Sequence, residues 1–261
     1  MANSWRERME FAVEAAWQAG KITLGHFQAG IETEWKADAS PVTVADRQSE
    51  EKIRALIARA YPEDGIWGEE FGDQQGTSGL RWLIDPIDGT KSFIQGVPLY
   101  GVLIGLDSPQ GVVVGAVYMP ALDEMVWAGR GEGCWWNGRR ARVSAVEEMQ
   151  NACLCYTSHT SFADHGRERA WAQLRRDSRL QRGWGDCYGH ILVATGRAEA
   201  CFDPVMNPWD CAPLLPILEE AGGTFTNWQG QATIYGKDAF STNGRIFDSV
   251  MAYLESSGDK T

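Results

Sequence analysis

Two short apolar runs, each followed at once by acidic residues, constrain most strongly what this chain can fold into. Gly65-Ile66-Trp67-Gly68 leads directly into Glu69-Glu70, and Leu80-Arg81-Trp82-Leu83-Ile84 leads directly into Asp85. Runs of this length predict buried strands. Open sheets bind their ligands at the ends of strands. We therefore predict a sheet whose strands end in carboxylates at the place where a ligand is expected.

Composition limits the classes of function. The chain has 261 residues, of which 44% are hydrophobic, so it can bury a substantial core as one compact unit or two small subdomains. No apolar stretch approaches the roughly 18 residues that a membrane span requires. A net charge of −11 disfavours binding to nucleic acids or anionic membranes, which requires clustered Lys and Arg. We expect neither partner, whereas cation sites suit an excess of carboxylates.

The N-terminus and the cysteines indicate the compartment. Residues 1–8 lack a positive segment followed by an apolar stretch, so no secretory signal is expected and we place the protein in the cytoplasm. The six cysteines include no Cys-x-x-Cys pair and no paired zinc-ligand spacing. This pattern favours buried, reduced thiols over a disulfide framework or a zinc site.

The apolar pattern predicts a layered α/β architecture. The first helix is expected from Ser4, where Ser4-x-x-Glu7 has the capping-box pattern, and the second covers residues 43–60 with Asp46 in its first turn. Residues 99–143 alternate strand-like runs with turns, as in an antiparallel meander. Further helices are expected at 166–177, 189–195, 210–221 and 245–255, and further strands at 153–156, 199–202 and near 224 and 240.

The pattern changes near residue 145, with no repeat and no linker at that point. We therefore expect an N-terminal α+β subdomain over residues 1–145, which holds the acidic segments described above. A C-terminal α/β subdomain over 146–261 would contribute substrate recognition.

The hexapeptide Asp85-Pro86-Ile87-Asp88-Gly89-Thr90 has two interpretations. Taken alone it could be a tight turn, since Pro, Asp and Gly are preferred there. A Pro-constrained turn can also direct both carboxylates and the Ile87 carbonyl into one small space, where cations relieve their repulsion. These hard oxygen ligands suit Mg²⁺ better than Zn²⁺. Free N–H groups of Gly89 and Thr90, at the start of an expected helix, would then face a phosphate.

Two other acidic segments have structural alternatives of their own. Glu69-Glu70 could be a solvated acidic pair, and Asn207-Pro208-Trp209-Asp210 could be a turn whose Asp caps a helix.

Together these segments resemble, in order and over nearly the whole chain, the signatures of the inositol monophosphatase family. Lys36 to Asp46 resembles the family's mobile loop and the acidic residue after it. The other matching segments are Gly68-Glu69-Glu70, Asp85 to Thr90, and Trp209-Asp210 with Glu219-Glu220-Ala221-Gly222-Gly223. The resemblance implies an α/β fold of the αβαβα sandwich type and a homodimeric, metal-dependent phosphatase that acts on a small phosphomonoester.

The resemblance also implies roles for individual residues. Two or three Mg²⁺ ions would be held by Glu69, Asp85, the Ile87 carbonyl, Asp88 and Asp210. Glu69, Thr90 and Asp46 would be the catalytic residues: Thr90 orients the attacking water, and Asp46 helps to position that water or a further ion. Water would attack phosphorus directly, without a covalent enzyme intermediate. The sequence contains no Gly-x-Ser-x-Gly elbow that would suggest one.

The segment Trp184-Gly185-Asp186-Cys187-Tyr188-Gly189 resembles the histidinol-phosphate phosphatase branch of that family. L-Histidinol phosphate carries an ammonium and an imidazole, so its pocket should offer carboxylates, and Asp186 and Asp203 are the candidates. Tyr188 could stack on the imidazole, and His190 could line the pocket.

Alternatives remain for these residues and for the whole protein. Asp186 could be a helix N-cap, and Asp203 could be a turn residue before Pro204. The substrate could be inositol 1-phosphate or another sugar-alcohol phosphate. A non-catalytic, RNA-associated regulator that keeps the fold is the alternative of another class.

Overall fold

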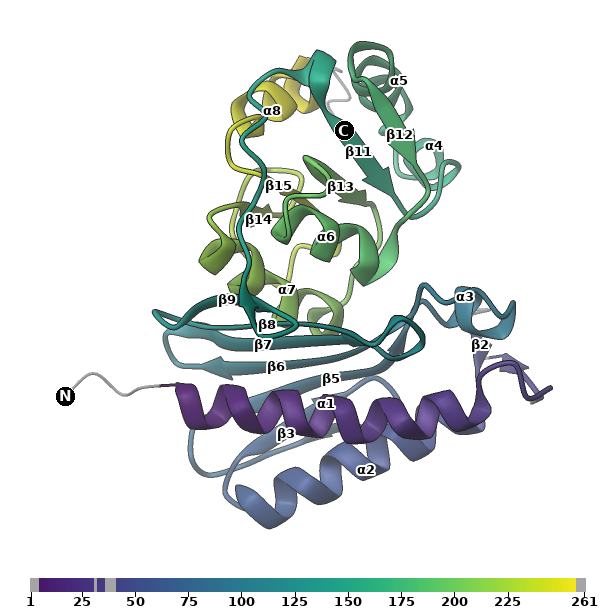
Figure 1. Cartoon of the computed structure of the whole chain (residues 1–261), viewed down its shortest axis with the longest axis vertical. Coiled ribbons are helices and arrows are strands. Elements are labelled where there is room, and N and C mark those ends of the chain that lie inside the picture. Colours follow the sequence, from purple (N-terminus) through teal and green to yellow (C-terminus); the bar gives the residue numbers. More distant parts are fainter. Residues whose placement is uncertain (1–4, 31, 36–40, 257–261) are drawn as a thin grey trace.

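The computed structural model describes residues 5–30, 32–35 and 41–256, and Figure 1 shows their arrangement in five layers. Two long helices cover one face of a large sheet, two helices lie between that sheet and a smaller one, and three helices cover the outer face of the smaller sheet. The predicted αβαβα sandwich is confirmed. The outer helices are α1 (Arg6–His26) and α2 (Val44–Ala60), the central ones are α6 (Asp186–Ala194) and α7 (Pro208–Ala221), and the last are α4 (Ser161–Asp164), α5 (Glu168–Asp177) and α8 (Phe247–Ser256).

The large sheet has eight strands in the order β10-β9-β8-β7-β6-β5-β3-β4. Its strands are β3 (Gly65–Gly68), β4 (Gly72–Gln74), β5 (Arg81–Asp88), β6 (Gly101–Ser108), β7 (Gly111–Met119), β8 (Glu124–Gly129), β9 (Gly133–Trp136) and β10 (Arg139–Arg140). Strands β6 to β10 form the predicted antiparallel meander. Strands β3 and β5 are parallel neighbours. Their carboxyl ends therefore meet at one edge, which brings the two acidic segments together.

The smaller sheet has five strands in the order β12-β11-β13-β15-β14. They are β11 (Cys153–Tyr156), β12 (Leu180–Arg182), β13 (Ala200–Asp203), β14 (Thr224–Thr226) and β15 (Ala239–Thr242). Strands β11, β12 and β13 are parallel, and β15 runs antiparallel to its two neighbours, β13 and β14. The remaining short elements are β1 (Glu34–Trp35), β2 (Pro41–Val42), α3 (Thr90–Ile94) and two 3₁₀ turns, η1 (Pro120–Leu122) and η2 (Met149–Asn151).

Element types match the prediction better than element ends do. The helix expected from residue 189 already begins at Asp186, and the one expected from residue 166 begins at Glu168. Strands β4 and β12 were not predicted, because these short, partly exposed edge strands carry few apolar residues. The expected cap at Ser4 lies outside the described residues. The predicted boundary at 145/146 falls between β10 and η2, although α6 and α7 of the second half pack on the sheet of the first.

Helix α7 lies unusually close to the large sheet. Gly105 and Gly115 are opposite each other on β6 and β7. A Cβ atom on Gly115 would lie 2.0 Å from the carbonyl oxygen of Pro213, and one on Gly105 would lie 2.8 Å from the Cβ of Ala212. Only residues without a side chain allow this approach. The glycine pair therefore sets the height of α7 above the sheet, and with it the position of the helix N-terminus.

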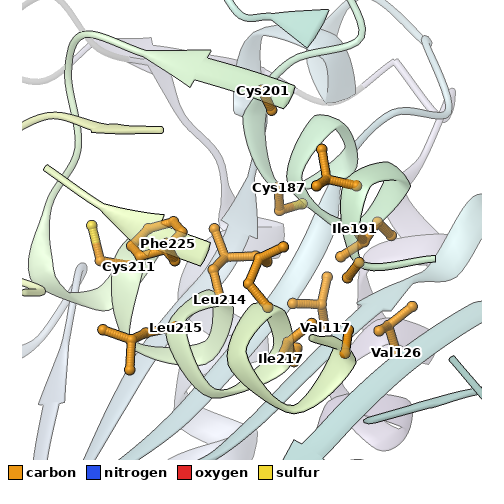
Figure 2. Close-up of a cluster of buried hydrophobic side chains, with 14 of the residues drawn as sticks. Val117, Val126, Cys187, Ile191, Cys201, Cys211, Leu214, Leu215, Ile217 and Phe225 are labelled. Carbon is orange, nitrogen blue, oxygen red and sulfur yellow. The ribbon is translucent and has the colours of Figure 1, made fainter. Parts of the chain in front are cut away.

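Apolar packing around α7 forms the largest core cluster. Figure 2 shows Leu214 and Ile217 of α7 close to Val117 and Val126 of the large sheet, with Ile191 of α6 beside them. All six cysteines are buried with free thiols, as predicted. The described part of the chain contains no helix with the length and apolarity needed to cross a bilayer.

Candidate active site

Three carboxylates meet where β5 ends and α7 begins. Asp85 and Asp88 lie among the last four residues of β5, and Asp210 belongs to the first turn of α7. One oxygen atom from each lies within 4.8 Å of the others. In the described part of the chain this is the one group of three or more potential metal-ligating side chains. Residues 122 positions apart in sequence are thus brought together as predicted.

The backbone of the hexapeptide is folded tightly around these acids. The Ile87 amide donates to Asp85 Oδ1 at 3.0 Å, and the Thr90 hydroxyl donates to the Ile87 carbonyl at 2.9 Å. Gly89 has a φ of 81°, and a Cβ there would lie 2.9 Å from the Leu99 carbonyl oxygen. The segment is therefore a constrained turn that also brings together oxygen atoms able to bind a metal ion.

Asp210 takes part in the capping box of α7 and is also a member of the acidic cluster. Asn207 is the N-cap of α7, and its backbone carbonyl accepts from the backbone N–H of Asp210 at 3.1 Å. In return Asp210 Oδ2 accepts from the Asn207 amide at 2.7 Å. This reciprocal capping box fixes the carboxylate in orientation. The ring of Trp209, beside it, lies edge-to-face against Trp67 of β3 at 5.7 Å.

Glu69 is positioned by a buried acid that the sequence analysis missed. The Glu69 amide donates to the Ile84 carbonyl at 3.1 Å, which continues the β3–β5 ladder. Glu50 of α2 then accepts from the Glu70 amide at 2.7 Å and the Phe71 amide at 3.3 Å. Arg54 Nε lies 2.7 Å from the same carboxylate, which is fully buried. Glu50 thereby holds the turn that carries Glu69.

A signal for Glu50 was present in the sequence. It shares the buried face of α2 with Ile53 and Ile57, and a carboxylate on such a face must have partners. Gly68 fits this arrangement, because a Cβ there would lie 1.9 Å from Glu50 Oε1.

Asp46 lies in the first turn of α2, as predicted. Its Oδ2 accepts from the Thr43 amide at 2.8 Å and the Thr43 hydroxyl at 2.6 Å, which completes a capping box. Burial raises the pKa of Asp46 to about 6, and the charge of Glu69 adds to the shift. Asp46 is therefore close enough to Glu69 to feel its charge, while one of its carboxylate oxygens accepts the hydrogen bonds of the helix cap. The expectation for the loop before it rests largely on residues 36–40, which lie outside the described residues.

The carboxylates of the cluster are buried close together, and a bound cation would offset their mutual repulsion. Burial raises the pKa of Asp85 well above its usual range, and the neighbouring carboxylates, Glu69 first among them, raise it further. Burial also raises the pKa of Asp88 and that of Asp210. A bound cation would favour the ionised forms. All candidate ligands are carboxylate or carbonyl oxygens, the chemistry of a Mg²⁺, Ca²⁺ or Mn²⁺ site, so the residues present fit a hard divalent metal.

Two further acids lie beside the cluster. Asp186 is the first residue of α6, and its Oδ2 would be 3.3 Å from a Cβ on Gly89. Asp203 ends β13. Burial raises the pKa of Asp203 to about 7 and that of Asp186 well above its usual range, and repulsion from Asp88 contributes to both shifts. The predicted pair is therefore close to the three-carboxylate group.

Asp186 does not cap its helix, and Asp203 makes only a weak turn contact. Gly185 is the N-cap of α6, and no side chain caps this helix, so Asp186 is not the capping residue. Asp186 instead adopts a φ of 51°, a left-handed conformation that Asp tolerates better than most residues. Asp203 Oδ1 lies 3.5 Å from the Val205 amide, a weak turn contact. Its other carboxylate oxygen accepts from Thr157 at 2.6 Å.

Tyr188 and His190 are not brought into this group. The ring of His190 is fully buried against Phe225 at 5.5 Å, its Nδ1 lies 2.8 Å from the Ser241 hydroxyl, and burial lowers its pKa to about 3. Tyr188 packs against the central core with the Arg197 guanidinium 5.9 Å from its ring. The prediction that His190 lines the pocket is wrong, because α6 turns this side chain toward β15. The ring of Tyr188 faces Arg197 and not the two acids.

The chain is similar to several known proteins. The model of the inositol monophosphatase family matches residues 4–257. A histidinol-phosphatase of Chlorobaculum parvum is 45% identical over 94% of this chain and 96% of its own length, and one of Streptomyces coelicolor is 37% identical over 90% and 92%. The crystal structure of extragenic suppressor protein suhB from Bartonella henselae matches with a TM-score of 0.89 at 27% identity, covering 95% of this chain and 98% of that one.

Proposed function

The chain belongs to the inositol monophosphatase family and is a phosphatase, and on that premise we propose that it hydrolyses L-histidinol phosphate to L-histidinol and phosphate with Mg²⁺ as cofactor. The observation that carries the proposal is the pair of acids, Asp186 and Asp203, beside the three-carboxylate cluster. A cluster of oxygen ligands suits a metal-bound phosphate. Two additional buried acids suit a leaving group that is cationic.

Oxygen atoms from three segments would hold two or three Mg²⁺ ions. These atoms are the carboxylates of Glu69, Asp85, Asp88 and Asp210 and the carbonyl of Ile87. Bound there, the metal would lower the pKa of a coordinated water and offset negative charge on the phosphoryl oxygens. The Glu50 contacts and the Asn207 capping box hold the ligands in place before metal binds, so little ordering would accompany binding.

The chain's own groups would orient the reactants. The Thr90 hydroxyl gives its hydrogen to the Ile87 carbonyl, which leaves its oxygen lone pairs to accept a hydrogen bond from the attacking water. Glu69 and Asp46 would complete the set around that water. The backbone N–H groups of Gly89 and Thr90, at the start of α3, are proposed to bind the phosphate. No protein nucleophile takes part in this route.

The leaving group would lie toward Asp186 and Asp203. L-Histidinol carries an ammonium group and an imidazole that binds a proton readily, and charge-assisted hydrogen bonds to carboxylates are the strong class of such contacts. A neutral polyol would leave two buried acids without cationic partners, which is costly. This difference favours histidinol phosphate over inositol 1-phosphate.

A substrate panel tests the proposal. Phosphate release at saturating Mg²⁺ is measured with L-histidinol phosphate, inositol 1-phosphate and p-nitrophenyl phosphate. We expect kcat/KM for L-histidinol phosphate to exceed that for inositol 1-phosphate by at least about tenfold, since one charge-assisted contact supplies that much discrimination. Asp186→Asn should lower kcat/KM for L-histidinol phosphate more than for p-nitrophenyl phosphate. A preference for inositol 1-phosphate, or equal losses in the variant, would contradict the proposal.

Family membership also leads us to propose a homodimer that acts in the cytoplasm, with neither nucleic acid nor membrane as partner. Light scattering of the purified chain measures its mass, and a monomer at micromolar concentration would contradict the dimer.

A further inference from the structure

We propose that Thr157 is a positioning residue for recognition of the cationic leaving group, because its single hydroxyl joins the two acids of that pocket. Thr157 directly follows β11 and lies between the N-terminus of α6 and the end of β13. Its Oγ1 lies 2.7 Å from the Asp186 amide nitrogen and 2.6 Å from Asp203 Oδ2. The inference rests on the proposed function, since it concerns how that substrate is selected.

The direction of both hydrogen bonds follows from the chemistry of the groups. A backbone amide can only donate, so the Thr157 oxygen accepts from Asp186. The hydroxyl has one hydrogen, which is then given to the Asp203 carboxylate. An ionised Asp203 is the better acceptor for that hydrogen, and the contact opposes the effect of burial on the pKa of Asp203. Thr157 therefore favours the charged form of Asp203 that a cationic group would bind.

Backbone packing holds the hydroxyl in this position. A Cβ on Gly185 would lie 2.2 Å from the Thr157 Cα, so the residue that follows β11 and the N-cap of α6 are in direct backbone contact. The next residue, Asp186, has its left-handed φ of 51° with its amide bound to Thr157. Non-glycine residues hold such a conformation where the surrounding contacts impose it. Thr157 thus fixes both the backbone of Asp186 and the side chain of Asp203.

This role is separate from metal binding. The Asp88 carboxylate takes its own hydrogen bond from the Cys187 amide, one residue further along α6, and Asp85 and Asp210 are held by the contacts described above. Because Thr157 is neutral, its loss changes no net charge in the site. We therefore expect loss of its hydroxyl to weaken binding of the cationic group while hydrolysis of an ester without such a group continues.

Matched variants test this. Thr157→Val keeps the side-chain shape and removes the hydroxyl, and Thr157→Ser keeps the hydroxyl. For Thr157→Val we expect KM for L-histidinol phosphate and the inhibition constant of L-histidinol to rise about 10- to 100-fold, the range for a hydrogen bond to a charged group. kcat/KM for p-nitrophenyl phosphate should change less than about threefold. Thr157→Ser should stay close to wild type for all three quantities.

Each other outcome decides against the inference. Equal losses on both esters in Thr157→Val, or no loss on either, would overturn it, as would a Thr157→Ser enzyme as poor as Thr157→Val. If Thr157→Val does not fold, Thr157→Ala is judged by the same readouts. A wild-type enzyme that does not prefer L-histidinol phosphate refutes the proposed substrate. Wild-type preference that survives in Thr157→Val refutes only the role of Thr157.

Discussion

Replacing Gly115 with Ala should show whether the close approach of α7 to the large sheet positions the active site. The new Cβ would lie 2.0 Å from the Pro213 carbonyl oxygen and 2.8 Å from its carbon. Both are backbone atoms, so no side-chain rotation relieves the overlap. Either the centre of α7 moves away from β7 or the strand is displaced.

The size of the effect follows from this geometry. Overpacking of a well-packed core typically costs 1–3 kcal/mol. Because the obstacle is backbone, we expect a loss of about 3 kcal/mol in the free energy of unfolding. For a chain of this size about 2–4 °C in midpoint temperature corresponds to each kcal/mol, so the midpoint should fall by roughly 6–12 °C. Asp210 lies in the first turn of α7, so the Mg²⁺ concentration for half-maximal activity should rise as well.

Gly25→Ala provides the control. Gly25 lies within α1, and a Cβ there would have no neighbour within 4 Å, so this variant should be stabilised by about 0.4–1 kcal/mol. Thermal unfolding followed by circular dichroism, together with a Mg²⁺ titration of activity, measures both effects. A Gly115→Ala protein that unfolds at the wild-type temperature and needs no more Mg²⁺ would refute the reasoning.

Three further perturbations test other parts of the site. Glu50→Gln removes a buried charge from its pairing with Arg54 and should lower the free energy of unfolding by up to roughly 3 kcal/mol in urea titrations; an unchanged value would contradict the contacts. Gly89→Ala, with its Cβ 2.9 Å from a carbonyl oxygen, should lower kcat/KM at least about tenfold, whereas Gly138→Ala, with a similar φ of 80° and open space, should not. The metal-free protein should gain stability as pH falls from about 7 toward 4, because the raised pKa values of Asp203, near 7, and Asp46, near 6, let the folded state bind protons that the unfolded chain lacks. Together these two acids outweigh the opposing effect of His190, whose pKa is lowered to about 3; a midpoint temperature that falls over this range would contradict the shifts of the two acids.

Features encoded by local pattern could be predicted from the sequence. The two acidic strand ends, the meander and the first turn of α2 with Asp46 depend on neighbouring residues, and the structure places each as expected. The group of Asp85, Asp88 and Asp210 joins distant parts of the chain, and here the ordered resemblance supplied what spacing could not.

Features that depend on tertiary packing were missed. The sequence indicates only that Glu50 needs partners. These are backbone amides of a turn about 20 residues later, and no sequence pattern identifies them. Thr157 acts through two acids on other elements, which the sequence presents only as a threonine after a strand. The error on His190 has a similar cause, since the face of α6 that carries it was known only once β15 was placed against it.

The most direct test of the central claim is phosphate release from L-histidinol phosphate by chelator-treated enzyme, before and after Mg²⁺ is restored. We predict no release without metal, saturable release once Mg²⁺ is added, and a much higher Mg²⁺ requirement in Asp210→Asn. Release that continues in excess chelator would contradict the metal site. Release that Mg²⁺ restores from inositol 1-phosphate, but not from L-histidinol phosphate, would contradict the substrate.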